Sequence, residues 1–65
     1  MADARERREV LFEFAVIGAV MKVVAIDAET GIEVMAMGPA RASRVDLQKL
    51  ALAKLKKRLS GPENR

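Results

Sequence analysis

The sequence predicts an α+β fold: a three-stranded antiparallel β-meander followed by one C-terminal α-helix packed on one sheet face. Three short runs of β-branched and other apolar residues predict the strands, and the glycines between them predict the turns. A run of strong helix formers, residues 47–59, predicts the helix. The length of 65 residues indicates one domain over residues 10–59, with flexible segments at residues 1–9 and 60–65.

Turn-forming residues separate the predicted strands. Residues 10–17 and 20–27 flank Gly18-Ala19, a pair that suits a type II′ hairpin turn with a positive φ at the glycine. The third strand, residues 32–37, follows the segment 27–31, which is typical of a type I turn ending in a left-handed glycine. We therefore expect two hairpins in series.

Capping residues mark both ends of the predicted helix. Ser43 is a good N-cap, and Asp46 three residues later makes a shorter relative of the capping box. Gly61-Pro62 follows Ser60 and is typical of a helix C-terminus.

The two faces of the predicted sheet follow from its register. We expect Ile17 opposite Val20 across the first turn, and Ile26 opposite Ile32 across the second. The helix should cover the face that carries two phenylalanines and three methionines; that face is Val10, Phe12, Phe14, Val16, Met21, Val23, Ala25, Met35 and Met37, with Asp27 and Glu33 at its end. The opposite face is also apolar, with only Glu13 and Lys22 polar; it consists of Leu11, Ala15, Ile17, Val20, Val24, Ile26, Ile32, Val34 and Ala36.

This second apolar face predicts an oligomer interface. One helix covers one face, whereas a solvated antiparallel sheet normally alternates apolar and polar residues. A chain this short is marginally stable alone, and without cysteine or histidine it has no disulfide and lacks the commonest metal ligand. We therefore expect a non-catalytic interaction module that forms a homo-oligomer, a dimer or higher, through those nine residues. A larger protein could occupy the same face, which would make the chain an accessory subunit.

The sequence offers little for catalysis. Its hydroxyl groups belong to Thr30 in a turn, Ser43 at a helix cap and Ser60 at a helix end, and no imidazole is present to activate them. The acids Asp27, Glu29 and Glu33 cluster near the second turn without the spacing of a calcium loop. We expect no catalytic residue, cofactor or metal.

The last third of the chain is basic and supports an alternative function, nucleic-acid or anion binding. Residues 41–65 hold eight Lys or Arg against two acids, a net charge of +6. Free N–H groups at the helix start beside two arginines could hold an anion, and exposed basic helix residues could contact phosphates. The candidates are Arg41, Arg44, Lys49, Lys54, Lys56, Lys57 and Arg58. A simply solvated helix face explains the same residues, because no exposed aromatic is predicted for base stacking.

Composition also bears on location. Residues 1–9 mix charge signs and lack the apolar run of a signal peptide, and charges interrupt the apolar stretch 10–26. The absence of cysteine is typical of a reducing compartment. We expect a cytoplasmic protein with no membrane partner.

Motifs spread over residues 9–59 resemble a known family. They are Phe12-Glu13-Phe14, Ile17-Gly18, Lys22-Val23, Ala25-Ile26-Asp27, Thr30-Gly31, Glu33-Val34, Gly38-Pro39-Ala40 and Leu50-Ala51-Leu52-Ala53-Lys54-Leu55. The chain resembles a family of very short, uncharacterised alphaproteobacterial proteins classed as a domain of unknown function. The resemblance implies a bacterial cytosolic setting and supplies no activity, cofactor or functional residue.

Overall fold

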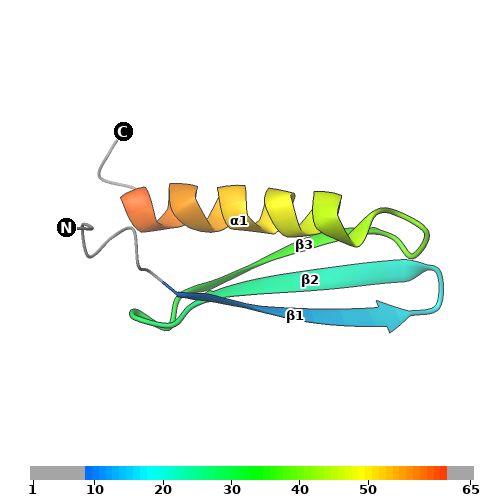
Figure 1. Ribbon diagram of the computed structural model, residues 1–65, viewed down its shortest axis with the longest axis horizontal. Coiled ribbons are helices and arrows are strands. Elements are labelled where there is room, and N and C mark those ends of the chain that lie inside the picture. Colours follow the sequence, from blue (N-terminus) through cyan, green and yellow to red (C-terminus); the bar gives the residue numbers. More distant parts are fainter. Residues whose placement is uncertain (1–8, 62–65) are drawn as a thin grey trace.

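The computed structural model describes residues 9–61, which form β1 (Val10–Ile17), β2 (Val20–Asp27), β3 (Glu33–Pro39) and α1 (Arg44–Ser60). The strands form one antiparallel sheet in the order β1-β2-β3, so β1 and β3 are its edges. The helix α1 lies along one face of this sheet (Figure 1). The predicted α+β meander with one C-terminal helix is confirmed. Residues 1–8 and 62–65, which make up most of the segments predicted to be flexible, lie outside the described residues.

The first hairpin has the predicted geometry. Ile17 lies opposite Val20, which leaves Gly18 and Ala19 as a two-residue loop. Gly18 has a φ of 61°, and no residue other than glycine has a positive φ in the described chain. A positive φ at only the first central residue is the signature of a type II′ turn, whose twist matches that of the strands. The predicted turn type is confirmed.

The second turn has a different register from the predicted one. The Asp27 carboxylate oxygen Oδ2 accepts hydrogen bonds from Thr30 N at 3.0 Å and from Thr30 Oγ1 at 2.7 Å. The Asp27 carbonyl accepts a further bond from Gly31 N at 2.8 Å, and Gly31 has a φ of 78°. These bonds keep Gly31 in the loop, so the ladder resumes at Ile32, whose carbonyl accepts from Asp27 N. Ile26 therefore lies opposite Glu33, and the expected pairing with Ile32 is wrong.

This register exchanges the two faces of β3. Val34 and Ala36 lie on the helix side, opposite Ala25 and Val23, whereas Met35 and Met37 lie on the other side. Ile32 also packs against the core. Three residues predicted for the open face, Ile32, Val34 and Ala36, therefore belong to the covered side. The covered side consists of Val10, Phe12, Phe14, Val16, Met21, Val23, Ala25, Asp27, Ile32, Val34, Ala36 and Gly38.

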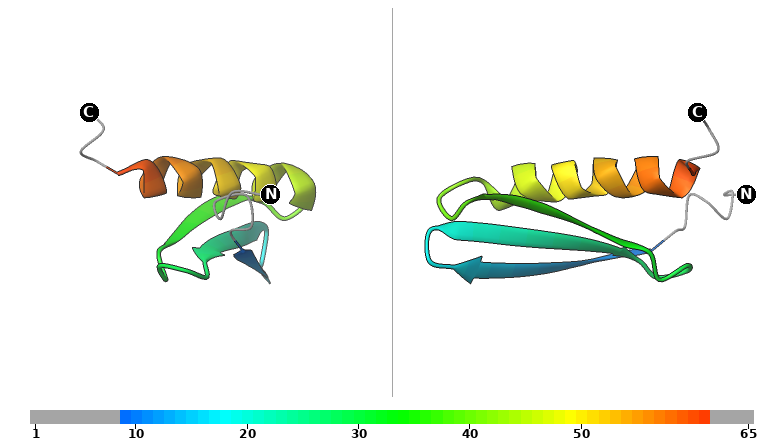
Figure 2. Two further views of the ribbon diagram at one scale, coloured as in Figure 1. Left: turned by 60° about the vertical axis from the view of Figure 1, so that its left-hand side comes forward. Right: turned by 180° about the vertical axis from the view of Figure 1, so that it is seen from behind.

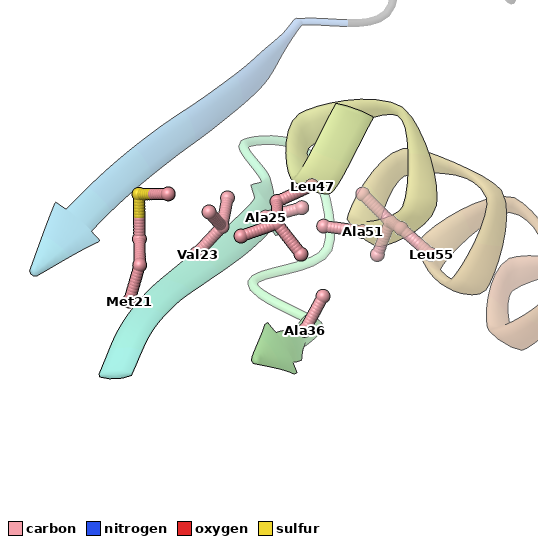
Figure 3. Close-up of a cluster of buried hydrophobic side chains, with 7 residues drawn as sticks. All are labelled: Met21, Val23, Ala25, Ala36, Leu47, Ala51 and Leu55. Atoms are coloured by element: carbon pink, nitrogen blue, oxygen red, sulfur yellow. The ribbon is translucent and has the colours of Figure 1, made fainter. Parts of the chain in front are cut away.

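Small residues let the helix approach the sheet closely. The buried core contains Met21, Val23, Ala25, Ala36, Leu47, Ala51 and Leu55 (Figure 3). A Cβ atom at Gly38 would lie 3.1 Å from Cδ2 of Leu47, tighter than ordinary van der Waals contact. Glycine and alanine beneath α1 therefore leave the space that Leu47 and Leu55 occupy.

The helix ends match the sequence signals. Ser43 Oγ accepts a hydrogen bond from Asp46 N at 3.2 Å, and this satisfies one of the free N–H groups of the first turn. At the other end Gly61 N donates to the Arg58 carbonyl at 3.1 Å. The predicted N-cap is confirmed.

The helix covers the sheet unevenly. It packs mainly on β2 and β3, and β1 lies farthest from it in each view (Figure 1, Figure 2). The covered-side residues of β2 are buried, whereas Phe12 and Phe14 of β1 are only half-buried. Val16, also on this side, is 53% exposed. One flank of the covered face therefore stays open.

We predict that the Thr30 hydroxyl stabilises the second turn. Thr30→Val removes one hydrogen bond to the buried Asp27 carboxylate and should lower the free energy of unfolding by about 1 kcal/mol. Thr30→Ser keeps the hydroxyl and should change it by less. Urea denaturation followed by circular dichroism measures both variants, and equal stability of the two would contradict this account of the turn.

Candidate functional site

The sheet face opposite α1 is open and carries many apolar side chains. We call this surface the outer face; it consists of Leu11, Glu13, Ala15, Ile17, Val20, Lys22, Val24, Ile26, Glu33, Met35, Met37 and Pro39. Five of its large apolar side chains are 41% to 71% exposed: Leu11, Ile17, Val20, Met35 and Met37. Each strand contributes at least one of them, so the apolar character extends across the whole sheet.

Six of the nine predicted interface residues lie on this face. They are Leu11, Ala15, Ile17, Val20, Val24 and Ile26. The sequence reasoning missed Met35 and Met37, because it assumed a shorter second loop. The spacing Asp27-x-x-Thr30 was the available signal, because an Asp side chain can accept a hydrogen bond from a nearby backbone N–H and so hold a turn. Whether these residues bind another chain stays a prediction.

Cross-strand pairs arrange the outer face in four rows. The row nearest the first hairpin holds Ile17, Val20 and Pro39, and the second holds Ala15, Lys22 and Met37. The third row holds Glu13, Val24 and Met35, and the fourth holds Leu11, Ile26 and Glu33. The first row is entirely apolar, and each other row carries a single charge. The three charges therefore lie on three different strands and in three different rows.

A shallow hollow opens at the hairpin end of the outer face. It is lined by Ala19, Val20, Met37, Gly38 and Pro39. The exposed Ile17 lies opposite Val20, at the margin of this hollow. The outer face therefore offers both a projecting apolar side chain and a depression that could receive one.

The basic residues are exposed but do not form a single strip. At about 100° per residue, Lys56 lies on the opposite side of α1 from Arg58. Lys54 Nζ donates a hydrogen bond to the Met35 carbonyl at 2.9 Å, and the Arg44 guanidinium lies 5.1 Å from the centroid of the Phe14 ring. The helix thus spreads the cations around its circumference, and it uses two of them in contacts with its own sheet.

The hydroxyl groups have the structural roles expected of them. Thr30 donates to the Asp27 carboxylate, Ser43 caps α1, and the Ser60 hydroxyl donates to the Lys56 carbonyl at 3.1 Å. Among residues 9–61, no three Asp or Glu side chains gather closely enough to hold a metal ion. Within the same range, no helix combines the length and apolar character needed to cross a membrane.

Comparison with known proteins adds a family and no residue role. A family model described as a domain of unknown function, DUF6898, matches residues 7–63. No curated protein and no solved structure matches the chain. The expected resemblance to a domain of unknown function is confirmed, and the alphaproteobacterial source stays a prediction.

We predict weak, salt-sensitive binding of nucleic acid by α1. Scattered lysines contact a phosphate backbone only through nonspecific attraction, with a log–log salt slope near −0.9 for each neutralised phosphate. Fluorescence anisotropy with duplex DNA at about 150 mM salt should give a dissociation constant above micromolar, in the nonspecific range. Lys56→Glu with Lys57→Glu should abolish what binding there is. Submicromolar binding at that salt concentration would instead favour the nucleic-acid alternative.

Proposed function

We propose that this chain, which belongs to the DUF6898 family, a domain of unknown function, is a small non-catalytic interaction module. It forms a homo-oligomer through its outer face. The observation that carries the proposal is the continuous apolar surface across all three strands, with Leu11, Ile17 and Met37 among its exposed side chains. In an antiparallel sheet with one face in water, apolar and polar residues normally alternate along each strand, so the uncovered face is polar.

The energy of covering this face supports the proposal. Contiguous apolar patches above a few hundred Å² are unusual on monomers and typically mark interaction sites. At about 25 cal/mol per Å², burying roughly 500 Å² on each copy gives on the order of 12 kcal/mol gross per copy. That gain can offset an association cost of about 4–15 kcal/mol. A chain of 65 residues without disulfides gains much of its stability from such a contact.

The charges of the outer face suit a symmetric pair. Consider two outer faces stacked around a two-fold axis that runs across the strands, midway between the second and third rows. Lys22 of each copy then lies beside Glu13 of the other, while the apolar first row meets the fourth. An axis along the strands would instead stack Lys22 of one copy on Lys22 of the other, and this contact between like charges is unfavourable. The axis across the strands therefore fits an isologous dimer.

Two alternatives use other observations. A larger protein could bind the outer face in place of a second copy, which would make the chain an accessory subunit. Nucleic-acid or anion binding draws on the exposed Arg41, Lys49 and Lys57, but Arg44 and Lys54 are engaged with the sheet. We place the module in the bacterial cytoplasm, because a chain without cysteine suits a reducing compartment.

The proposal predicts that a charge on the outer face weakens assembly. Met35→Lys puts a cation at a site that is 45% exposed, so the subunit should fold while its dimer affinity falls about tenfold or more. Leu50→Lys is a matched control, because Leu50 is 49% exposed and lies on α1. Sedimentation equilibrium gives the dissociation constants, and circular dichroism checks the fold.

Two outcomes would contradict the proposal. One is a wild-type protein that stays monomeric at micromolar concentration. The other is an equal loss of affinity in both variants, since the contact would then not be specific to the outer face.

A further inference from the structure

The two edges of the sheet are protected to different degrees. At β3, Lys54 Nζ donates to the Met35 carbonyl at 2.9 Å, Pro39 has no N–H to offer, and α1 lies above the strand. Proteins use lysine, proline and covering helices to stop an edge strand from pairing with another chain. The edge strand β1, Val10–Ile17, contains no lysine, proline or glycine, and its sole charged residue is Glu13. It is an apolar eight-residue edge without these devices.

The covered side of β1 is also open. The helix packs mainly on β2 and β3, so Phe12 and Phe14 are half-buried and Val16 is 53% exposed. The Arg44 guanidinium lies over the Phe14 ring, where it contributes a cation–π contact and shields part of one aromatic face. An unprotected edge and an uncovered apolar flank therefore coincide on one strand.

We infer that β1 pairs with β1 of a second copy as antiparallel edge strands, joining two sheets into one of six strands with both helices on the same side. This contact uses the strand edge and the covered-side flank, and it is independent of the stacking of outer faces described above. The partner is a second copy of this chain, because two β1 strands can pair so that their apolar side chains lie opposite each other. The possible registers show this.

Symmetry limits the registers of such a pair. Both helices lie on the same side of the joined sheet only if even-numbered residues of one β1 lie opposite even-numbered residues of the other. The two-fold axis must then pass through a residue position. An axis at Glu13 sets the two Glu13 carboxylates opposite each other, which is destabilising. An axis at Phe14 removes that clash. It pairs Phe14 with Phe14, Phe12 with Val16, Leu11 with Ile17, and Glu13 with Ala15.

The Phe14 register covers what α1 leaves open. It brings Phe12, Phe14 and Val16 of both copies into one apolar strip on the side of the helices. Aromatic and β-branched pairs across neighbouring strands are among those that stabilise a sheet. A register with the helices on opposite sides would split this strip between two faces, and Phe14 would lie beside Leu11, Glu13, Ala15 or Ile17 of the other copy. The charge and side-chain pattern of β1 therefore favours the Phe14 register over the Glu13 register and over those that place the helices on opposite sides.

Disulfide trapping tests the register directly, because the chain contains no cysteine. In the Phe14 register, residue 12 of one copy lies opposite residue 16 of the other, within the Cα separation of about 4.4–6.8 Å that a disulfide requires. A mixture of Phe12→Cys and Val16→Cys chains should form covalent dimers at least about tenfold faster than Val16→Cys alone, whose two thiols are far apart. Equal rates, or no cross-link in the mixture, would overturn the inference.

A second variant keeps the test decisive if Phe12→Cys destabilises the subunit. Val16→Lys places a charge on the exposed flank and should weaken association about tenfold or more, whereas Val45→Lys should not. Val45 is the matched control because it is 57% exposed and lies on α1. An unchanged mass for Val16→Lys in sedimentation equilibrium would overturn the inference. In the Met35→Lys background the cross-link should persist, which separates failure of this contact from failure of the outer-face contact.

Discussion

The turn between β2 and β3 sets the arrangement on which the other features depend. The Asp27 carboxylate accepts two hydrogen bonds from Thr30, and its carbonyl accepts one from Gly31, so four residues lie in the loop. A loop one residue shorter would turn Met35 and Met37 toward α1. Ala36 and Gly38 would then leave the space in which Leu47 packs, and two long side chains would take their place. The turn and the small residues under the helix thus specify the same register.

The register in turn decides what the molecule leaves uncovered. The close contact of α1 with Ala25, Ala36 and Gly38 draws the helix toward β2 and β3. One helix, about 10–12 Å wide with its side chains, cannot also cover β1 or reach the opposite face. The chain therefore keeps two apolar surfaces, the outer face and the open flank of β1. In a domain this small, covering such surfaces by association is a common way to gain stability.

Local signals predicted most of the fold. Gly18-Ala19 identified the first hairpin, Ser43 identified the start of α1, and apolar runs identified all three strands. These features depend on residues close in sequence. The register of β3 could not be read in the same way, because the odd-numbered and the even-numbered residues of 32–37 are both apolar apart from Glu33. The bond from the Asp27 side chain to Thr30 and the fit of Ala36 and Gly38 beneath α1 distinguish the two registers.

The candidate site was predictable to the same extent. The β1 and β2 contributions to the outer face follow from a two-residue turn, whose register is unambiguous. Met35 and Met37 depended on the second turn and were assigned to the wrong face. The lateral position of α1 is a tertiary property, set by where Gly38 and Ala36 give Leu47 room, and the open flank of β1 follows from it.

Methyl contacts of the methionines test the central claim most directly. One sample would mix chains carrying ¹³C-methyl methionine with unlabelled chains, and an isotope-filtered NOE experiment would record contacts between copies. We expect intermolecular NOEs from the Met35 and Met37 methyl groups to apolar side chains of the partner, and intramolecular ones from Met21 to the core. Intramolecular NOEs from Met35 to Leu55, or the absence of any intermolecular NOE at Met35 and Met37, would contradict the account.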